Sequence, residues 1–251
     1  MVDRLRSRGS VRSAVVWESV RAAVGELVAV TGRDRLDVLD AGGGTGGFAV
    51  PLAELGHAVT VVDASPDSLA ALDRRAAEAS VANRVRAVQG DAMTLLDVVE
   101  PATFDLVICH SVLEVVDDPS VALASVVACL RQGGLVSIVA ANRWAVVLHR
   151  ALAGRFDEAV QAVHDPLGRY AANDPTPRRF DAHDLEVLIM GAGLAVASMH
   201  GARVFADLLP GGVFDSDPQA IEALIALESA AAAVPAFRDI ATQLHVVARR
   251  D

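Results

Sequence analysis

A run of glycines after a short apolar segment limits what this chain can fold into. The segment LDVLD, residues 36–40, is followed by AGGGTGG, so five of the eight residues from Asp40 to Gly47 are glycine. Gly42, Gly44 and Gly47 have the spacing G-x-G-x-x-G, which joins a strand to a helix in dinucleotide-binding βαβ units. The same glycines are compatible with a ligand that has no phosphate. The run therefore predicts a nucleotide-type cofactor and leaves its identity to the rest of the chain.

Short β-rich runs alternate with amphipathic helical patterns along the sequence. We predict strands at residues 36–40, 58–63, 85–89, 104–109, 135–140, 194–200 and 244–248. A helix is predicted from Ser65, because Ser65-Pro66 suits an N-cap followed by proline at the first helical position. Such alternation predicts a Rossmann-like α/β fold, with a mostly parallel seven-stranded sheet and helices on both faces. Ligands of these sheets bind beyond the carboxyl ends of the strands.

Length and composition fit one domain over residues 1–251, with 53% hydrophobic residues to fill a core. We expect a helical cover at residues 1–30, a cofactor-binding half at 31–140, a lid or insert at 141–182 and an acceptor-side half at 183–251. Residues 153–180 contain several turn-forming residues and little periodicity. A long loop inside a compact domain is commonly a lid or binding segment, and we predict one here.

The net charge and the cysteines limit which ligands and which cellular compartment are expected. The formal net charge is −10 and the isoelectric point is near 5.1. An acidic chain has no global field that attracts a polyanion, so nucleic acid would need a local basic patch. Cys109 and Cys129 both lie in apolar stretches and are predicted to be buried thiols, with no metal site. No apolar tract is long enough to span a membrane, so a cytoplasmic protein without a membrane partner is expected.

Three aspartates at predicted strand ends indicate the kind of cofactor. Asp40 stands directly before the glycines, where a carboxylate would repel a pyrophosphate but suits a cation or an ammonium group. Asp63 ends the second strand, where an acid can bind ribose hydroxyls. Asp91, in QGDAM, follows the third strand and can accept from an adenine amino group. Asp40 disfavours a pyrophosphate, whereas Asp63 is compatible with either kind of cofactor, so a nicotinamide dinucleotide stays open at this point.

The motifs DAGGG, VVDAS, QGDAM, HSVLEVV and LRQGG occur in this order between residues 36 and 140. In this order they resemble class I S-adenosylmethionine-dependent methyltransferases. The resemblance implies the class I fold and S-adenosyl-L-methionine as cofactor, with S-adenosyl-L-homocysteine as product. It also implies that the backbone of Gly42, Gly43 and Gly44 approaches the cofactor and that Asp63 binds the ribose. Methyl transfer needs mostly positioning and exclusion of water, so the lack of a catalytic triad is no objection.

The resemblance extends beyond these motifs. VRSAVVW, HSVLEVV, AANRWAVVLHRALAGRFD, GARVFADLL and LHVVAR are similar to segments of the bacterial tRNA 5-carboxymethoxyuridine methyltransferases. That similarity covers nearly the whole chain and implies that a carboxylate on a wobble uridine of tRNA is esterified. By this match Arg12, Ala92 and His110 join the cofactor site. The resulting set is Arg12, Asp40, Gly42, Gly43, Gly44, Asp63, Asp91, Ala92 and His110.

One segment departs from that family. The family has a lysine-rich stretch before the sixth strand, whereas the corresponding segment here holds only Arg169, Arg178 and Arg179 as basic residues. Phosphate contacts supply much of the affinity for nucleic acid. A methyltransferase for a small carboxylic acid, or for another small metabolite, is therefore the alternative. A non-catalytic protein that binds the cofactor is the second alternative. The sequence leaves the oligomeric state open.

Arg203 is the candidate for holding the methyl acceptor. It follows the sixth predicted strand in GARVFADLL and is flanked by apolar residues. The planar guanidinium binds a carboxylate through two parallel hydrogen bonds. We predict that Arg203 orients the acceptor, helped by Tyr170 or Arg179, and that a structural ion pair is the competing role. No metal ligand is predicted.

Overall fold

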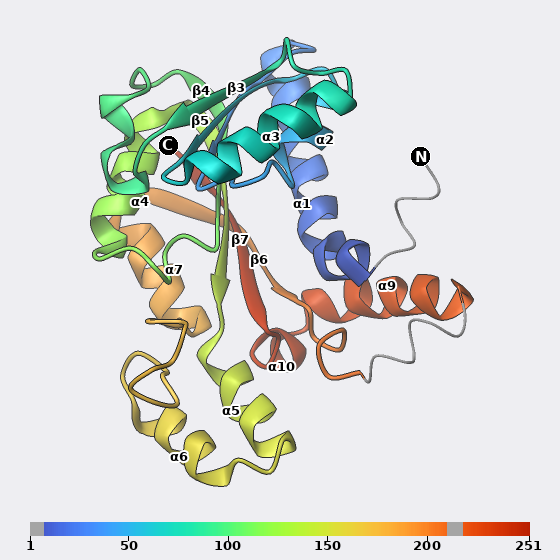
Figure 1. Cartoon of the computed structure of the whole chain (residues 1–251), viewed down its shortest axis with the longest axis vertical. Helices are drawn as coiled ribbons and strands as arrows, with labels where there is room; N and C mark the ends of the chain where they lie inside the picture. The colour runs from blue at the N-terminus through green and yellow to red at the C-terminus, as the bar shows by residue number, and fades with distance from the viewer. Residues whose placement is uncertain (1–7, 210–217) are drawn as a thin grey trace. The chain divides into compact units, whose positions relative to one another are not determined.

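A computed structural model of the chain describes residues 8–209 and 218–251 (Figure 1). Seven strands form one sheet in the order β3-β2-β1-β4-β5-β7-β6. Their bounds are β1 Asp37–Ala41, β2 Ala58–Asp63, β3 Val85–Gln89, β4 Phe104–His110, β5 Leu130–Ala141, β6 Leu194–Ala202 and β7 Gln243–Arg250. All seven predicted strands are confirmed. The largest difference is at β5, which begins at Leu130 and includes the LRQGG motif.

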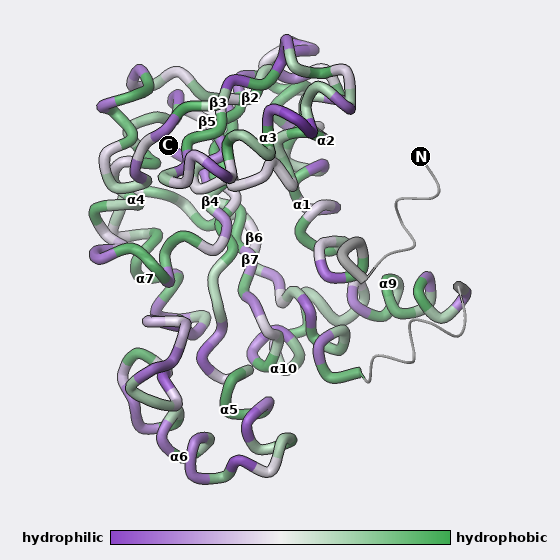
Figure 2. Tube along the Cα trace, viewed as in Figure 1, coloured by the Kyte–Doolittle hydropathy of each residue, from purple (hydrophilic) through white to green (hydrophobic). Residues whose placement is uncertain are grey.

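The central strands are parallel and buried. β1 pairs in parallel with β2 on one side and β4 on the other, and the pairs β2–β3 and β4–β5 are parallel too. β4 and β5 consist mostly of hydrophobic residues (Figure 2), as expected of strands with both faces covered. The order of the strands reverses between β1 and β4. The crevice at the carboxyl ends of these two strands is the usual ligand site of such a sheet.

Helices connect the strands. They are α1 Arg8–Thr31, α2 Ala49–Glu54, α3 Pro66–Glu78, α4 Pro119–Cys129, α5 Arg143–Leu152, α6 Phe156–His164, α7 Ala182–Gly191, α9 Pro218–Ala232 and α10 Pro235–Arg238, with a 3₁₀ helix, η2, at Ala92–Asp97. The predicted start of α3 is confirmed: Ser65 Oγ accepts from the Ser68 amide at 3.2 Å, and Pro66 is the first helical residue. Over the described residues, no helix has the length and apolar character needed to cross a bilayer.

The expectation of a loop without helical structure at 153–180 is wrong in its first half, where α6 forms. This helix packs on α5, and its buried residues are the small Ala159 and Ala162. Its larger apolar side chains, Phe156 and Val160, are exposed. Phe156, Ala159, Val160 and Val163 recur at helical spacing, so the pattern is present in the sequence, but it spans only nine residues between turn-forming segments. The remaining residues, 165–181, are an irregular loop.

The described residues form two compact units. The first contains 8–19, 140–185, 199–209 and 218–245; the second contains Val20–Val139, Glu186–Ser198 and Val246–Asp251. The glycine loop and the carboxyl ends of β1 to β4 belong to the second unit. Arg12, Tyr170, Arg179 and Arg203 belong to the first unit.

Candidate functional site

The second unit brings Asp40, Asp63 and His110 to the carboxyl ends of three neighbouring strands. Asp40 lies in β1 opposite Val61 of β2, while Asp63 and His110 are the last residues of β2 and β4. These positions follow from the parallel register, which brings equivalent strand ends to one edge of the sheet. The edge matches the ligand position that the strand order indicates.

The structure favours glycine at the three predicted cofactor positions for different reasons. A Cβ on Gly43 would lie 2.4 Å from Cγ of Asp40, and one on Gly42 would lie 2.6 Å from Cγ2 of Val112. These two glycines make room for the protein's own side chains. Gly44 has φ +55° and its nearest neighbour would be Oδ2 of Asp63 at 3.9 Å. Only Gly44 therefore leaves open space next to the backbone.

Asp40 is the buried charge of this site. Its side chain contacts Gly43, and the residue is 3% exposed. Burial, and secondly the nearby carboxylate of Asp63, raises the pKa of Asp40 to about 7. Low dielectric and a like charge both disfavour ionisation, and a cation next to the carboxyl would reverse both effects. The site is therefore built to gain from a positively charged ligand.

The carboxylate of Asp63 is fixed by two backbone amides. Gly44 donates to Oδ2 and Ser65 donates to Oδ1, each at 2.9 Å. A carboxylate oxygen can accept more than one hydrogen bond, so both oxygens keep capacity for a pair of hydroxyl groups.

Asp91 and Ala92 lie where β3 leads into η2. Asp91 Oδ1 accepts from the Met93 amide at 2.8 Å, so this aspartate caps the 3₁₀ helix. Its side chain is exposed, and Ala92 is the first residue of η2. The cap accounts for one carboxylate oxygen of Asp91.

His110 is a neutral histidine at the end of β4. Its Nε2 lies 2.7 Å from Oγ of Ser137, and the ring of Phe48 packs edge-on at 4.6 Å between centroids. Burial lowers the pKa of His110 to about 3. At physiological pH the imidazole therefore carries no charge that could repel a cationic ligand, and it offers an aromatic and polar surface instead.

The first unit holds Arg203 in a group of three charged residues. Its Nη2 lies 2.5 Å from Oδ2 of Asp207, and Nε of Arg12 lies 3.0 Å from the other oxygen, Oδ1. The side chain of Asp207 is only 8% exposed, so the two guanidinium groups enclose a nearly buried carboxylate. His149 lies nearby, and burial lowers its pKa despite the opposing effect of Asp207. The group therefore has one net positive charge.

Arg203 also has an unused donor. Its Nε is buried and has no hydrogen-bond partner among the residues that the structure describes. A buried donor without an acceptor is costly, and such atoms often mark the place of a ligand. Arg12, which the sequence places in the cofactor site, is found in the same unit as Arg203 and pairs with its partner.

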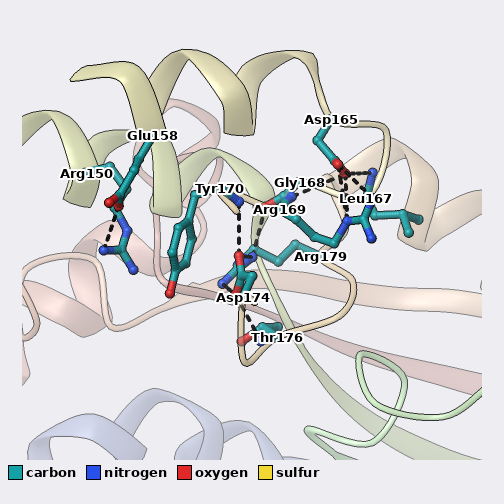
Figure 3. Close-up of polar contacts among 10 residues, drawn as sticks. All are labelled: Arg150, Glu158, Asp165, Leu167, Gly168, Arg169, Tyr170, Asp174, Thr176 and Arg179. Carbon is teal, nitrogen blue, oxygen red and sulfur yellow. Dashed lines mark hydrogen bonds and ion pairs between the residues drawn. The ribbon is translucent and has the colours of Figure 1, made fainter. Parts of the chain in front are cut away.

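Arg179 and Tyr170 lie in the loop after α6 (Figure 3). Arg179 donates to the Gly168 carbonyl and, through both terminal nitrogens, to Asp174 at 2.7 and 3.1 Å. The ring of Tyr170 lies under the Arg150 guanidinium, 3.5 Å from its centroid. These contacts explain Arg179 as a residue that fixes its own loop, and we do not carry it into the acceptor site.

Two residues of the first unit were missed by sequence reasoning. Asp207 lies inside GARVFADLL, four residues after Arg203. That spacing could have indicated an ion pair between the two residues. Glu228, 0% exposed in α9, accepts hydrogen bonds from the turn that follows Arg203. Helical spacing places Glu228 on the same face as the buried Ile221 and Leu224, whereas Glu222 lies off that face, so the spacing could have indicated the burial of Glu228.

Comparison with known proteins agrees with this architecture. Residues 39–138 match a family model described as a methyltransferase domain. The chain is 30% identical over 244 residues to the tRNA 5-carboxymethoxyuridine methyltransferase of Escherichia coli (strain K12), covering 97% of this chain and 90% of that protein. It is 36% identical over 108 residues, 43% of this chain and 41% of the relative, to a ubiquinone biosynthesis O-methyltransferase of Methylocella silvestris.

The chain is a class I S-adenosylmethionine-dependent methyltransferase. It belongs to the same family as the E. coli enzyme, with which it aligns over nearly its full length. A solved S-adenosylmethionine-dependent methyltransferase from Methanosarcina mazei has the same fold, with a TM-score of 0.60 at 16% identity over 87% of this chain and 93% of that one. Magnesium protoporphyrin IX methyltransferase from Synechocystis, crystallised with S-adenosylhomocysteine, gives 0.58 at 17% identity over 93% and 83%.

The residues of this methyltransferase fit its cofactor. S-adenosylmethionine has a sulfonium and an ammonium group, and the buried carboxyl of Asp40 gains from a cation. Asp63 offers two fixed acceptor oxygens for the ribose hydroxyls, and Gly44 leaves the backbone open. Because this cofactor has no phosphate, the site needs no group that binds a triphosphate or a pyrophosphate. Among residues 8–209 and 218–251, no three His, Cys, Asp or Glu side chains gather as a metal site would require.

Proposed function

We propose that this methyltransferase esterifies a carboxylate, and that the acceptor is the carboxylate of a modified wobble uridine in tRNA. The observation that carries the proposal is the charge group around Arg203. Two arginines share one buried aspartate, which leaves one positive charge, and Nε of Arg203 has no partner among the described residues. A single carboxylate would balance that charge and accept from that donor. The relative in E. coli supports tRNA as the source.

The neutral histidines agree with a carboxylate acceptor. A carboxylic acid has an unperturbed pKa of about 4, so it is already ionised at neutral pH and needs no general base. Neither His110 nor His149 is favoured as a charged group, because burial lowers the pKa of each. An amine or hydroxyl acceptor would have to lose a proton during the reaction.

The chain's residues act by positioning. When bound, the cofactor supplies a methyl group on a sulfonium, and the sulfur keeps the electron pair of the broken S–C bond as the new C–O bond forms. Arg203 would hold one carboxylate oxygen and leave the other free to accept the methyl group. Asp207 would keep the guanidinium in place, since its oxygen is 2.5 Å from Nη2. No proton is transferred in this reaction. Orientation and exclusion of water are therefore the main contributions of the protein.

A small carboxylic acid is the second candidate acceptor, and a specific observation favours it. The loop at 165–181 is poor in uncompensated positive charge: Arg169 pairs with Asp165 at 2.9 Å, and Arg179 pairs with Asp174 at 2.7 Å. With a net charge of −10, phosphate contacts by this loop are weakened. A small acid needs only the charge at Arg203.

Assays with the purified protein distinguish the two sources. The substrates are tRNA containing the unmethylated carboxymethoxyuridine and a panel of small carboxylic acids, with S-adenosylmethionine as donor. Nucleoside mass spectrometry that shows a methyl ester in the tRNA supports the first candidate. Ester formation on small acids alone supports the second. Methylation of an amine or hydroxyl compound, with no carboxylate accepted, would contradict the proposal.

Replacing Arg203 tests the carboxylate contact directly. Arg203→Lys keeps the charge but cannot reproduce the planar fork, so kcat/KM for the acceptor should fall about 100-fold, as when a positioned donor is lost. Affinity for S-adenosylhomocysteine, measured by calorimetry, should stay unchanged. Arg155→Lys, at an exposed position of the same unit, is the matched control. Full activity of Arg203→Lys, or a parallel loss of cofactor binding, would contradict the role of Arg203.

A further inference from the structure

We infer that Glu228 is a positioning residue for the methyl acceptor, because its carboxylate fixes the turn that carries Arg203. This inference rests on the proposed function and identifies what holds its central residue in place. Glu228 lies in α9, which is otherwise rich in alanine and leucine, and the residue is 0% exposed. A fully buried carboxylate is costly unless strong hydrogen bonds compensate it. Its partners therefore show what it does.

The partners of Glu228 are three consecutive backbone amides after β6. Val204 donates to Oε2 at 2.8 Å, while Phe205 and Ala206 donate to Oε1 at 2.9 and 2.7 Å. Successive amides that converge in this way form a concave anion site in many proteins. Here the protein's own side chain occupies that site.

The turn that Glu228 fixes begins at an unusual conformation. Arg203 has φ +62°, in the left-handed region that residues with a Cβ seldom adopt. Such a conformation persists only where the surrounding structure imposes it. The three hydrogen bonds to Glu228 begin at the next residue, and the Arg203 carbonyl accepts from the Thr242 amide at 3.2 Å. The direction of the Arg203 side chain thus depends on the turn.

Two of the three charged residues in the group around Arg203, Arg203 itself and Asp207, belong to this turn. Arg203 precedes the three amides and Asp207 follows them, and the two side chains meet at 2.5 Å. Between them, Val204 and Ala206 enter two separate apolar clusters. Without the carboxylate of Glu228, three amides in the interior lose their acceptor, and the turn would rearrange to satisfy them. The rearrangement would move Arg203 relative to the acceptor.

Only a carboxylate serves all three amides. Glu has two acceptor oxygens, whereas Gln has one oxygen and an NH₂ group that donates. In Glu228→Gln the NH₂ group would face at least one backbone N–H, which is also a donor. This variant keeps the shape of the side chain and changes only its hydrogen bonding. It is therefore a more specific test than truncation.

The experiment compares Glu228→Gln with two controls. Glu222→Gln makes the same chemical change at an exposed position of α9, and Leu185→Ala destabilises the same unit through its buried core in α7. For each variant we would measure thermal stability, the affinity for S-adenosylhomocysteine, and kcat and KM for the acceptor. Because small displacements of a positioning group are costly, Glu228→Gln should lose about 10- to 100-fold in kcat/KM for the acceptor. Cofactor affinity should not change.

The controls decide whether the effect is specific. Glu222→Gln should behave as wild type, and Leu185→Ala should lose stability with little loss of kcat/KM at a temperature where it is folded. A loss in Glu228→Gln no larger than that of Leu185→Ala would overturn the inference. Normal activity of Glu228→Gln on a carboxylate that wild type methylates would overturn it while the proposed function stands.

A second measurement does not depend on the acceptor. Hydrogen exchange of peptides covering residues 200–209 should be faster in Glu228→Gln than in wild type or Glu222→Gln, because three amides lose their acceptor. Slow exchange in all three proteins would contradict the inference even if no carboxylate were a substrate. Fast exchange in Glu228→Gln, with no methylation of carboxylates by wild type, would support the positioning of the turn and contradict the proposed function.

Discussion

We predict that Asp40 makes cofactor binding depend on pH. Its pKa is raised to about 7 by burial and by Asp63, and a bound cation would favour the ionised form. Binding of S-adenosylmethionine should therefore release a proton, and its affinity should rise about 10-fold between about pH 6 and pH 8. Calorimetry in two buffers with different ionisation enthalpies measures both quantities. Asp40→Asn should bind more weakly and lose this dependence; a pH-independent affinity in wild type would contradict the role of Asp40.

The stability of the cofactor-free protein should respond to pH in the opposite direction. The pKa of Asp40 is higher in the folded protein than in the unfolded chain, so the folded state holds the proton more tightly. The contribution of this residue is therefore fully present below the unfolded pKa, about 4, and is lost as pH rises through about 7. The pH that weakens cofactor binding thus favours the empty fold.

At the residue scale, strand ends could be predicted and local contacts could not. Asp40 and Asp63 could be identified because apolar strands end at or beside them, and a parallel sheet brings such ends together; His110 entered the set through the family resemblance. The glycines of the loop indicate backbone freedom, but sequence does not show what occupies the space beside each one. Gly43 makes room for Asp40 itself. The spacing of α9 places Glu228 on its apolar face, but its partners are backbone amides, which the sequence does not identify.

At the scale of elements, Asp174 holds the loop after α6 together. Its carboxylate accepts from Arg179 and from the backbone amides of Tyr170 and Thr176, and its side chain is 0% exposed (Figure 3). Removing one partner of a buried ion pair typically costs about 3 kcal/mol, so Asp174→Asn should speed tryptic cleavage after Arg169 and Arg179 by roughly 10- to 100-fold. Asp157→Asn, on α6, is the control. Equal cleavage rates would show that the ion pair does not restrain the loop.

The same digestion tests whether the loop is a lid. We predict that cofactor plus acceptor slows cleavage of wild type between residues 165 and 179, because closing water out favours methyl transfer. The cleavage sites in this range are Arg169, Arg178 and Arg179; α6 contains no Lys or Arg and is not cut by trypsin. Identical rates with and without both ligands would contradict a lid.

Strands with clear β-branched runs could be predicted from the sequence, and a short helix between turn-forming residues could not. β2 and β3 have their predicted bounds because β-branched runs end at turn-forming or polar residues. α6 does not stand out in the sequence because it is short and lies between turn-forming residues, Gly154 before it and Pro166 after it, although its apolar residues recur at helical spacing. The LRQGG motif was read as a connection before β5. The structure includes it in that strand, since Arg131 binds Asp37 and Asp105 of β1 and β4 there.

At the scale of the whole molecule, the end of the sheet opposite the cofactor residues carries an ion-pair network. Asp105, at the start of β4, is 3% exposed and pairs with Arg131 of β5 at 2.7 Å and with Arg33, which follows α1. It also accepts from the Asp37 backbone amide of β1 at 2.9 Å. One side chain therefore ties three strands and the end of α1 together. The predicted cofactor residues thus lie at the carboxyl ends of these strands, and the stabilising ion-pair network lies at their amino ends.

Asp105 should make stability depend on acid pH. Burial opposes its ionisation, but hydrogen bonds from the Asp37 amide, Arg131 and Arg33 outweigh burial and hold the pKa below its usual range. A carboxyl whose folded pKa is depressed stabilises the fold above its unfolded pKa, about 4, and that contribution is lost as pH falls through the folded pKa.

Asp105→Asn should lower the free energy of unfolding at neutral pH by about 2 kcal/mol, because the Asp37 amide and two partly exposed arginines lose a charged acceptor. Urea unfolding measured from neutral pH down to acid should show wild type losing this margin over the variant as pH falls, since both carry an uncharged side chain at the end of the titration. Asp73→Asn, exposed on α3, is the matched control and should unfold as wild type does. Cofactor affinity should be unchanged in Asp105→Asn, because the site lies at the other end of the strands. A constant difference in stability across the acid range would show that packing of the side chain, and not its charge, accounts for the effect.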